Sequence, residues 1–284
     1  MCSREREFMS AIRLIVSDLD GTLLSPDHSL SKSVIDAVEE FTSRGGLFTF
    51  ATGRPFLTAA AFETQLQLQL PYILCNGSVL ACTGQIVESQ DFMLDDLAGL
   101  LEEADEQLVD VLMFGEGGVS VFRASEPVAA YEAKEKVACS LVDRTADASW
   151  RVGRVQKVIL MGNMNVIRPL WERHQPGLKL QYSTFQSEVN YWEIIPPGQS
   201  KGAALRRLAE RLDIRPDEIM AIGNQMNDLD MLLAAGIGVA VANSPDELKA
   251  QADYVCEAGY GDGVVEAIRR FCLKTGPVQS AVEI

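Results

Sequence analysis

The sequence predicts an α/β fold, a Rossmann-like, doubly wound parallel sheet that carries an inserted α+β domain. Strand-like apolar runs alternate with helix-like segments near both ends of the chain, which is typical of βαβ units. The apolar residues Ile12, Leu14, Ile15 and Val16 lie on both faces of the first strand, as expected of a parallel strand covered by helices on each side. The pattern of strand-like and helix-like segments changes from about Gly84, which indicates that a second kind of domain interrupts the first.

The first βαβ block follows directly from residue 12. Apolar residues at helical spacing predict a helix over 30–43, which Gly45 and Gly46 end. A strand is expected at 47–51 and a helix at 56–68, with Pro55 suited to the first turn. A short strand at 71–75 closes this block.

The middle of the chain predicts an α+β domain. It begins with an acidic helix at 91–108 and a hairpin, 109–114 with 119–123, around a glycine turn. The elements expected next are a helix at 127–137, a strand at 155–161, a helix at 166–174, and strands at 178–184 and 188–195. The last third returns to the first pattern, with helices at 200–212, 227–235, 245–251 and 263–271, and strands at 219–222, 237–242 and 254–256. We therefore expect one domain from residues 1–83 and 191–284, and an inserted domain from residues 84–190.

Composition limits the classes of partner. The formal net charge of −15 argues against a surface for nucleic acid or anionic membranes, because no basic excess exists to replace phosphate counterions. The six cysteines are scattered without a CxxC pair, which predicts reduced thiols in a cytoplasmic protein. The charged start of the chain lacks the apolar core of a signal peptide, and Met9 is an alternative initiator to Met1. A monomer or homodimer is expected.

The most informative motif is Asp18-Leu19-Asp20-Gly21-Thr22, at the end of the first predicted strand. Ligands of doubly wound sheets bind beyond the carboxyl ends of the strands. Asp18 is placed to attack phosphorus and form an aspartyl phosphate, and Asp20 to protonate the leaving alkoxide and later deprotonate water. The two carboxylates leave the same face of the strand unless the turn rotates one of them. The alternative is an Asx turn that caps the next segment.

Two further motifs contain residues that can bind an anion such as phosphate. Thr52 ends the second strand, where its hydroxyl and the Gly53 amide can hold phosphate oxygens and Arg54 can reach the anion. Lys201 begins a helix, a position where the macrodipole disfavours a cation unless an anion lies nearby. The alternatives are a simple helix start at Thr52, a surface ion pair of Arg54 and a solvated lysine.

The segment 223–228 follows a strand and opens a helix, so Asn224 and Asp228 can both face one cation while Asn227 orients a phosphate. The alternative is an N-cap, which would occupy one of the three residues. Mg²⁺ is the fitting ion because it takes oxygen ligands and few carboxylates together with phosphate and water. The chain has only two histidines, His28 and His174, far apart in sequence, which argues against a zinc site.

The whole set of motifs resembles the haloacid dehalogenase superfamily, and within it the Cof-type phosphatases with a large α/β cap. The resemblance covers nearly the whole chain, and the order and spacing of its motifs are specific. The motifs are 18–23 (DLDGTL), 51–54 (ATGR), 75–77 (CNG), 200–202 (SKG), 223–228 (GNQMND), 241–244 (VANS), 252–255 (ADYV) and 262–264 (DGV).

The resemblance implies roles for residues of this chain. Asp18 would be the nucleophile, Asp20 the acid/base, and Thr52 and Lys201 the phosphate holders. The Asp18 carboxylate, the Asp20 carbonyl and the 223–228 motif, through Asn224 and Asp228, would bind Mg²⁺. The substrate side would be lined by Asn76, Asn227 and Asn243. One departure concerns the metal, because the family usually has Gly-Asp where this chain has Gly223-Asn224. An amide supplies less charge than a carboxylate, so we expect weaker Mg²⁺ affinity unless Asp228 compensates.

The resulting expectation is a Mg²⁺-dependent phosphatase acting on a small phosphorylated metabolite such as a sugar phosphate, with specificity set by the inserted domain. Polar positions of that domain, Arg123, Arg154 and Lys157, are more often solvated than functional, so no contact residue is nominated. Three alternatives are a phosphomutase, a dehalogenase, and a non-catalytic module that binds phosphorylated ligands, the last motivated by Asn224.

Overall fold

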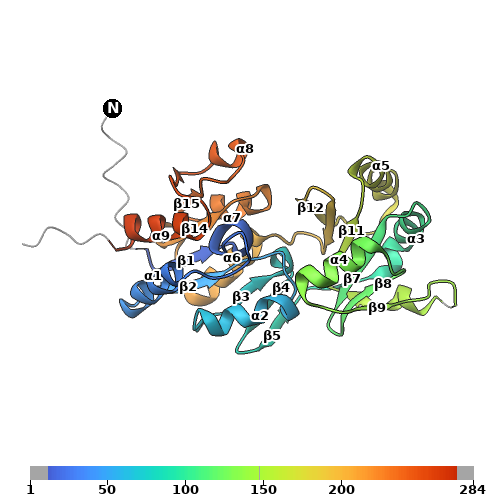
Figure 1. Cartoon of the computed structure of the whole chain (residues 1–284), viewed down its shortest axis with the longest axis horizontal. Helices are drawn as coiled ribbons and strands as arrows, with labels where there is room; N and C mark the ends of the chain where they lie inside the picture. Colours follow the sequence, from blue (N-terminus) through green and yellow to red (C-terminus); the bar gives the residue numbers. More distant parts are fainter. Residues whose placement is uncertain (1–11, 147, 274–284) are drawn as a thin grey trace, which may run out of the picture. The chain divides into compact units, whose positions relative to one another are not determined.

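The computed structural model describes residues 12–146 and 148–273, and the chain divides into two compact units. Unit 1 comprises residues 1–50 and 209–284, and unit 2 comprises residues 51–208, with the division falling inside helix α6 (Lys201–Leu212). Figure 1 labels many of the helices and strands of both units. The predicted inserted segment 84–190 lies wholly within unit 2, and its limits stay a prediction.

Unit 1 contains a parallel sheet of five strands, which confirms the predicted α/β core. The strand order is β16 (Tyr254–Val255), β15 (Ile237–Ala240), β14 (Ile219–Gly223), β1 (Leu14–Ser17) and β2 (Leu47–Phe50). Leu14 of β1 aligns with Ile219 on one side and with Leu47 on the other. All four residues of β1 are buried, as its apolar sequence predicts.

The order in which successive strands are added to this sheet reverses at β1. From β1 the chain proceeds to β2 on one side, whereas the later strands β14, β15 and β16 follow one another outward on the other side. Such a reversal is a topological switch point, and in doubly wound sheets the crevice beyond the carboxyl ends at that point binds the ligand. Asp18 follows β1 directly, and Asn224 follows β14 directly.

The helices of unit 1 form where the sequence places their signals. Helix α1 (Lys32–Ser43) begins after Ser31, whose hydroxyl accepts a hydrogen bond from the Val34 amide at 3.3 Å. Its apolar face includes Val34, Val38 and Phe41, and it packs against α9 (Tyr260–Phe271). Helix α7 (Leu229–Ala234) packs against β14 and β15, and α8 (Asp246–Lys249) is a single turn.

Unit 2 is built around a sheet of six strands, all paired antiparallel except for the last pair. The strand order is β12 (Ser183–Glu188), β13 (Tyr191–Ile195), β11 (Lys157–Met161), β7 (Asp110–Gly115), β8 (Gly118–Val121) and β9 (Cys139–Leu141), and the β8–β9 pair is parallel. The predicted hairpin around residues 115–118 is present as β7 and β8.

Both faces of this sheet are covered by helices, so β7 is buried on both sides. Val111 and Met113 belong to the core shared with α3 (Ala98–Glu106) and α5 (Met164–His174), whereas Leu112 and Phe114 belong to the core shared with α4 (Glu126–Glu135). This division follows from the two-residue period of a strand, which sends successive side chains to opposite faces.

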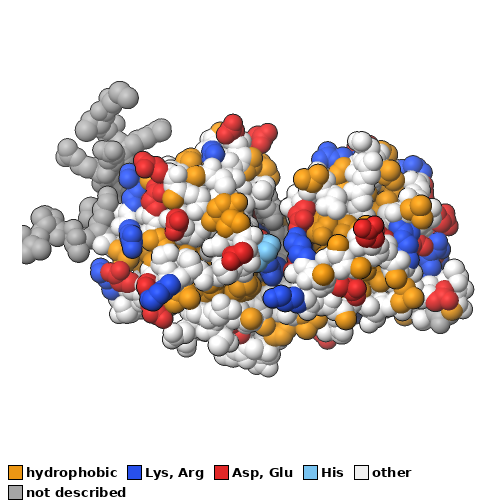
Figure 2. Space-filling view, viewed as in Figure 1, with side chains coloured by type: hydrophobic (Ala, Val, Ile, Leu, Met, Phe, Trp, Pro, Cys, Tyr) orange, Lys and Arg blue, Asp and Glu red, His pale blue; other side chains and the backbone are white. Residues whose placement is uncertain are grey.

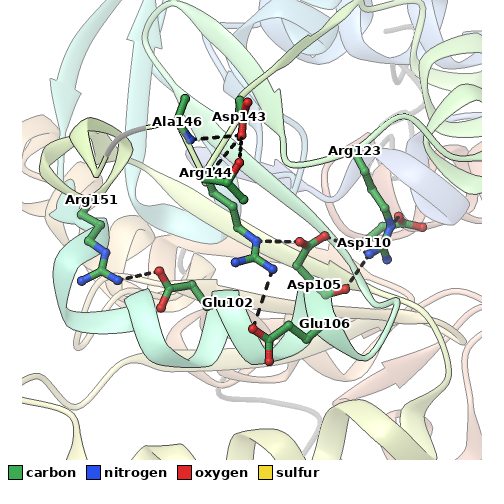
Figure 3. A network of polar contacts seen from close by, with 10 residues as sticks. Glu102, Asp105, Glu106, Asp110, Arg123, Asp143, Arg144, Ala146 and Arg151 are labelled. Carbon is green, nitrogen blue, oxygen red and sulfur yellow. Dashed lines mark hydrogen bonds and ion pairs between the residues drawn. The ribbon is translucent and has the colours of Figure 1, made fainter.

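An ion-pair network ties α3 to the strands and loops around it (Figure 3). The Arg123 Nε donates to Asp110 Oδ1 at 2.9 Å, and its Nη1 donates to Asp105 Oδ1 at 2.8 Å. The other Asp105 oxygen accepts from Arg144 Nε at 2.6 Å. Two carboxylates therefore hold Arg123, which gives it a structural role and leaves it, as expected, without a nominated substrate contact. On the visible face of the molecule acidic and basic side chains intermingle (Figure 2).

The rest of unit 2 contains two smaller sheets and one further helix. Strands β3 (Tyr72–Leu74), β4 (Val79–Cys82) and β5 (Gln85–Ser89) form an antiparallel sheet, preceded by α2 (Phe56–Gln65), and β6 (Phe92–Met93) pairs with β10 (Arg154–Val155). The β4–β5 hairpin is not predicted from the sequence. Its turn residues Thr83 and Gly84 both have positive φ, and the Glu63 carboxylate accepts hydrogen bonds from both of their amides. Distant Glu63 thus stabilises a turn that lacks the usual Asn-Gly signal.

Three other predicted elements differ from the structure. The helix expected over 91–108 begins only at Ala98, after the short strand β6 and a 3-10 turn at Leu94–Leu97. The strand expected over 178–184 is displaced to Ser183–Glu188, and the one expected from 188 begins at Tyr191. In each case a few polar residues next to an apolar run obscured the boundary.

The five described cysteines, Cys75, Cys82, Cys139, Cys256 and Cys272, are free thiols, while Cys2 lies outside the described residues. Burial raises the pKa of the Cys75 thiol to about 11 and that of Cys256 to about 12. No helix in the described part of the chain combines the length and the hydropathy that a membrane span needs.

Candidate active site

Asp18 is the buried carboxylate at the end of β1, with 5% of its surface exposed. Its amide donates to the Ile222 carbonyl of β14 at 2.9 Å, and its Oδ2 accepts the Thr22 hydroxyl at 3.0 Å. The chain then makes a tight turn, Leu19–Leu23, in which Gly21 has φ +79°. A Cβ at Gly21 would lie 2.3 Å from the nearest atom of the Asn224 side-chain amide, so glycine is required for both the backbone conformation and the space.

Asn224 at the end of β14 faces three oxygens of the 18–22 segment. Thr22 has a single hydroxyl hydrogen, which it donates to Asp18, so the Asn224 amide nitrogen is the donor to Thr22 Oγ1 at 3.0 Å. In this orientation the same nitrogen lies 3.2 Å from Asp18 Oδ2 and 3.1 Å from the Asp20 carbonyl oxygen. Three acceptors thus surround one amide group.

The Asp20 side chain is more exposed than that of Asp18. Its Oδ1 lies 3.0 Å from His28 Nδ1, and its side chain is 37% exposed. The turn therefore rotates one of the two carboxylates, so Asp18 is buried whereas Asp20 faces solvent. His28 has φ +61°, a conformation uncommon for a residue with a side chain, and its amide donates to the Ser25 carbonyl at 2.8 Å.

Asp228 and Asn243 support the backbone around the cluster. Asp228 is fully buried, and its Oδ2 accepts the Asn224 amide at 2.9 Å and the Gln225 amide at 3.0 Å. Asn243 donates to the Gly21 carbonyl at 2.8 Å and accepts the Tyr260 amide at 2.9 Å, which links the turn after β1 to α9. Asn227 is half-buried in the turn between Asn224 and α7.

In unit 2 the predicted anion-binding residues of the 52–54 loop are close to Asn76. The Thr52 amide donates to the Ile73 carbonyl at 2.9 Å, the Cys75 amide to the Arg54 carbonyl at 3.0 Å, and the Asn76 amide to the Thr52 carbonyl at 3.0 Å. Thr52 is 1% exposed, and its Oγ1 accepts the Arg54 amide at 3.1 Å.

Arg54 and Asn76 have side-chain partners from the six-stranded part of unit 2. Arg54 Nη1 lies 3.6 Å from Glu135 Oε2 of α4, and its guanidinium lies 5.6 Å from the Phe62 ring centroid. Asn76 is fully buried with φ +51°, and its Nδ2 donates to Glu193 Oε2 at 2.9 Å. Both residues predicted to bind phosphate or substrate thus have acidic partners.

Lys201 is 1% exposed at the start of α6, where the Ser200 hydroxyl accepts the Ala203 amide at 3.1 Å. The helix start packs tightly on the turn that holds Asn76. A Cβ on Gly77, whose φ is +103°, would lie 2.1 Å from the Ser200 carbonyl oxygen. Because Lys201 is buried, the alternative interpretation of it as a solvated lysine at a helix start is wrong.

Three residues next to the candidate site escape sequence reasoning: His28, Lys157 and Glu193. His28 has no motif of its own, and Glu193 lies in an apolar strand far from the other motifs. Lys157 is expected to be solvated, but the structure buries it to 3% exposure. No cluster of three or more His, Cys, Asp or Glu side chains suited to a metal occurs among the described residues.

Comparisons with known proteins identify the family. Residues 15–268 match the family model of haloacid dehalogenase-like hydrolases. The chain is 28% identical to the pyridoxal phosphate phosphatase YbhA of Escherichia coli, over 91% of this chain and 97% of that protein. It is 29% identical to the HMP-PP phosphatase of Serratia proteamaculans, over 84% of this chain and 86% of that protein.

Solved structures agree with this assignment. A haloacid dehalogenase-like hydrolase from Bacteroides thetaiotaomicron is 25% identical, with a TM-score of 0.78, covering 91% of this chain and 98% of that chain. By contrast, the chain spans only 46% of the length of a plant relative, the chloroplastic endoribonuclease YBEY of Arabidopsis thaliana. Family membership and the names of the relatives confirm the predicted enzyme class, a hydrolase acting on phosphoric monoesters. The chain belongs to the haloacid dehalogenase-like hydrolase family.

Proposed function

We propose that this chain is a Mg²⁺-dependent phosphatase that hydrolyses small, sugar-phosphate-like phosphomonoesters through an aspartyl phosphate on Asp18. The observation that carries the proposal is the position of Asp18, a buried carboxylate at the switch point of a parallel sheet. A cytoplasmic location, a small phosphorylated metabolite as substrate, and a monomeric or homodimeric state are parts of the same proposal.

In the first step an Asp18 carboxylate oxygen attacks phosphorus, and the bond from phosphorus to the ester oxygen breaks. Asp20 donates its proton to the departing alkoxide. In the second step a water molecule gives its proton to Asp20 and attacks phosphorus, which releases phosphate and restores the Asp18 carboxylate. One Asp20 oxygen, Oδ1, lies 3.0 Å from His28 Nδ1, so His28 is placed to hold this carboxyl group.

The residues of unit 1 fit a divalent cation that prefers oxygen ligands. The Asp18 carboxylate and the Asp20 carbonyl lie within 3.2 Å of the same Asn224 amide, so the donor set is rich in hard oxygens. To contribute an oxygen, the Asn224 amide has to turn over. When bound there, Mg²⁺ would neutralise charge on the transferring phosphoryl group. Asp228 already accepts two backbone amides, so we assign it a supporting role beside the proposed ligands.

The remaining roles concern the phosphate and the substrate. We assign the Thr52 hydroxyl, the Gly53 amide and the Lys201 ammonium to the phosphoryl oxygens, and Arg54, Asn76, Asn227 and Asn243 to the surroundings of the substrate. The side chains of Asn76 and Asn243 already hold protein groups, which favours an indirect role for both. The inserted segment 84–190 is the proposed specificity domain.

One observation supports a second candidate, a non-catalytic module that binds phosphorylated ligands. The neutral Asn224 amide nitrogen lies within 3.2 Å of acceptors of both Asp18 and Asp20, at a position that the proposed cation would occupy. A phosphate-release screen over a panel of metabolites, with wild type, Asp18→Asn and the exposed Asp36→Asn as control, separates the candidates. The proposed function predicts Mg²⁺-dependent release that only Asp18→Asn abolishes. Tight binding of sugar phosphates with no turnover in saturating Mg²⁺ supports the second candidate. Transfer of phosphate back to the substrate without net release identifies a phosphomutase.

A further inference from the structure

Lys157 of β11 and Glu193 of β13 form a buried ion pair in unit 2. Their exposures are 3% and 4%, and Lys157 Nζ lies 3.2 Å from Glu193 Oε2. Removing two charges from water is costly, and well-packed apolar residues are often at least as stable in such places. Stability alone is therefore a weak reason for this pair.

Lys157 has two further partners besides Glu193. Its Nζ donates to the Gly53 carbonyl at 2.8 Å, and the ammonium lies 4.6 Å from the centroid of the Phe114 ring. The carboxylate, the carbonyl and the ring face together account for the three hydrogens of the ammonium. Lys157 thus connects the six-stranded sheet to the loop that carries Thr52.

Glu193 is connected to the same loop through Asn76. Its Oε1 accepts the Ser187 hydroxyl at 2.6 Å, and its Oε2 accepts Asn76 Nδ2 at 2.9 Å. A Cβ on Gly53 would lie 3.3 Å from this Asn76 nitrogen, so the Asn76 side chain packs against Gly53. The Asn76 amide in turn donates to the Thr52 carbonyl.

A single peptide plane transmits the Lys157 contact to Thr52. The Gly53 carbonyl and the Arg54 amide belong to one planar peptide unit, so fixing the direction of the carbonyl fixes the direction of the N–H. That N–H donates to Thr52 Oγ1 at 3.1 Å. With this acceptor position occupied, the Thr52 hydroxyl hydrogen is directed to another side, as a donor to an anion.

We propose that Lys157 and Glu193 are positioning residues for phosphoryl transfer: they hold the 52–54 loop so that the Thr52 hydroxyl and the Gly53 amide meet the phosphoryl oxygens. The inference rests on the proposed function, which assigns those two groups to phosphate. Donors fixed before the reaction stabilise the transition state without reorganisation. Residues that never touch the substrate therefore determine the rate of the phosphoryl step.

The test compares three variants. Lys157→Met with Glu193→Gln removes the donor to Gly53, while the amide oxygen introduced by Glu193→Gln can still accept from Asn76. Glu193→Gln alone keeps the Lys157 donation to Gly53. The control, Lys179→Met with Asp95→Asn, removes an ion pair of the same unit whose side chains are 78% and 52% exposed. We measure kcat and KM with p-nitrophenyl phosphate, inhibition by inorganic phosphate, melting temperature, and hydrogen exchange of the peptide that spans residues 51–56.

We expect kcat of the double variant to fall about tenfold to a hundredfold, as for a small misplacement of catalytic groups. Exchange at 51–56 should rise and phosphate should inhibit less, while the Lys179/Asp95 control matches wild type. The kcat of the Glu193→Gln variant alone should be close to that of wild type and well above that of the double variant. If the pair served stability alone, the single variant would be more impaired than the double variant, because Glu193→Gln leaves the buried Lys157 cation without its counter-charge.

The inference is overturned if the double variant lowers the melting temperature but leaves kcat, phosphate inhibition and exchange at 51–56 unchanged. It is also overturned if Glu193→Gln alone is the more impaired variant. If wild type hydrolyses no phosphomonoester, the proposed function fails. Exchange at 51–56 and the affinity for inorganic phosphate then still decide whether Lys157 and Glu193 position the loop.

Discussion

The amide nitrogen of Asn224 lies 3.2 Å from Oδ2 of Asp18, at the adjoining ends of two neighbouring parallel strands. The same nitrogen is 3.1 Å from the Asp20 carbonyl oxygen. A neutral donor therefore occupies the position between two oxygens that a cation would otherwise join. This nitrogen has two hydrogens for three oxygen acceptors, and the proposed cation would have to displace it in order to join the Asp18 and Asp20 oxygens.

Replacing Asn224 with Asp should tighten Mg²⁺ binding by on the order of tenfold, because a carboxylate adds charge and no amide has to turn over. Isothermal titration of the protein with Mg²⁺ measures this directly. The same variant should melt at a lower temperature than wild type in EDTA, since two carboxylates then face each other without a cation. An unchanged Mg²⁺ affinity would contradict this account of the site.

Gly21→Ala should destabilise the fold and disturb the site, because φ is +79° and the new Cβ would lie 2.3 Å from the nearest atom of the Asn224 side-chain amide. The left-handed backbone alone costs about 1–2 kcal/mol for a residue with a side chain. Gly45→Ala is the matched control, since φ is +89° there but nothing lies within 4 Å of a Cβ. Denaturant unfolding should show a larger loss for Gly21→Ala, and only that variant should lose phosphatase activity. Equal losses would mean that the Asn224 contact is unimportant.

Much of the fold was predictable because its signals are local. The apolar run before Asp18 and the helical spacing of apolar residues within 30–43 indicate their elements without any distant partner. The candidate site was predictable in part, since each motif follows a strand. The pairing of Asp20 with His28 depends on a turn that rotates one carboxylate, and no spacing rule reveals that rotation.

Long-range pairs are the other part that sequence reasoning missed. Lys157 and Glu193 are partners only because β11 and β13 are neighbours in a sheet whose strand order differs from the chain order. A charged residue in an apolar strand predicts an exposed side chain unless its partner is known. The Thr83 turn has the same explanation, because Glu63 stabilises it from another element.

Glu103 should contribute to stability in a pH-dependent way. A hydrogen bond from His174 lowers the pKa of Glu103 below 4.5, outweighing burial, and the Arg173 charge adds to the effect. A carboxyl with a lowered folded-state pKa stabilises the fold above its unfolded value of about 4.5. That contribution disappears as the pH falls through the folded-state pKa. Melting temperatures of wild type should exceed those of Glu103→Gln at pH 7 and converge with them below about pH 4.5.

The control for this pH series is Glu116→Gln, which changes an exposed carboxyl in the β7–β8 turn. Its melting temperature should follow wild type at every pH. A difference between wild type and Glu103→Gln that persists unchanged down to about pH 3 would contradict the assignment.

The thiols of Cys75 and Cys256 should resist alkylation in the native protein. Burial raises their pKa to about 11 and about 12, so the reactive thiolate is scarce at pH 8. Iodoacetamide labelling followed by peptide mass spectrometry should modify both only after unfolding. The half-buried Cys82 provides the internal comparison. Rapid native labelling of Cys75 would show that the segment next to Asn76 opens readily.

The most direct measurement is the chemical state of Asp18 during turnover. Wild type is quenched in acid while it hydrolyses a phosphomonoester in Mg²⁺, and the peptide that contains Asp18 is examined by mass spectrometry. We predict a phosphoryl group on Asp18, together with a rate in Asp18→Asn that is lower by about a thousandfold or more. Turnover with no phosphoryl group on Asp18, or a rate that Asp18→Asn leaves intact, would contradict the central claim.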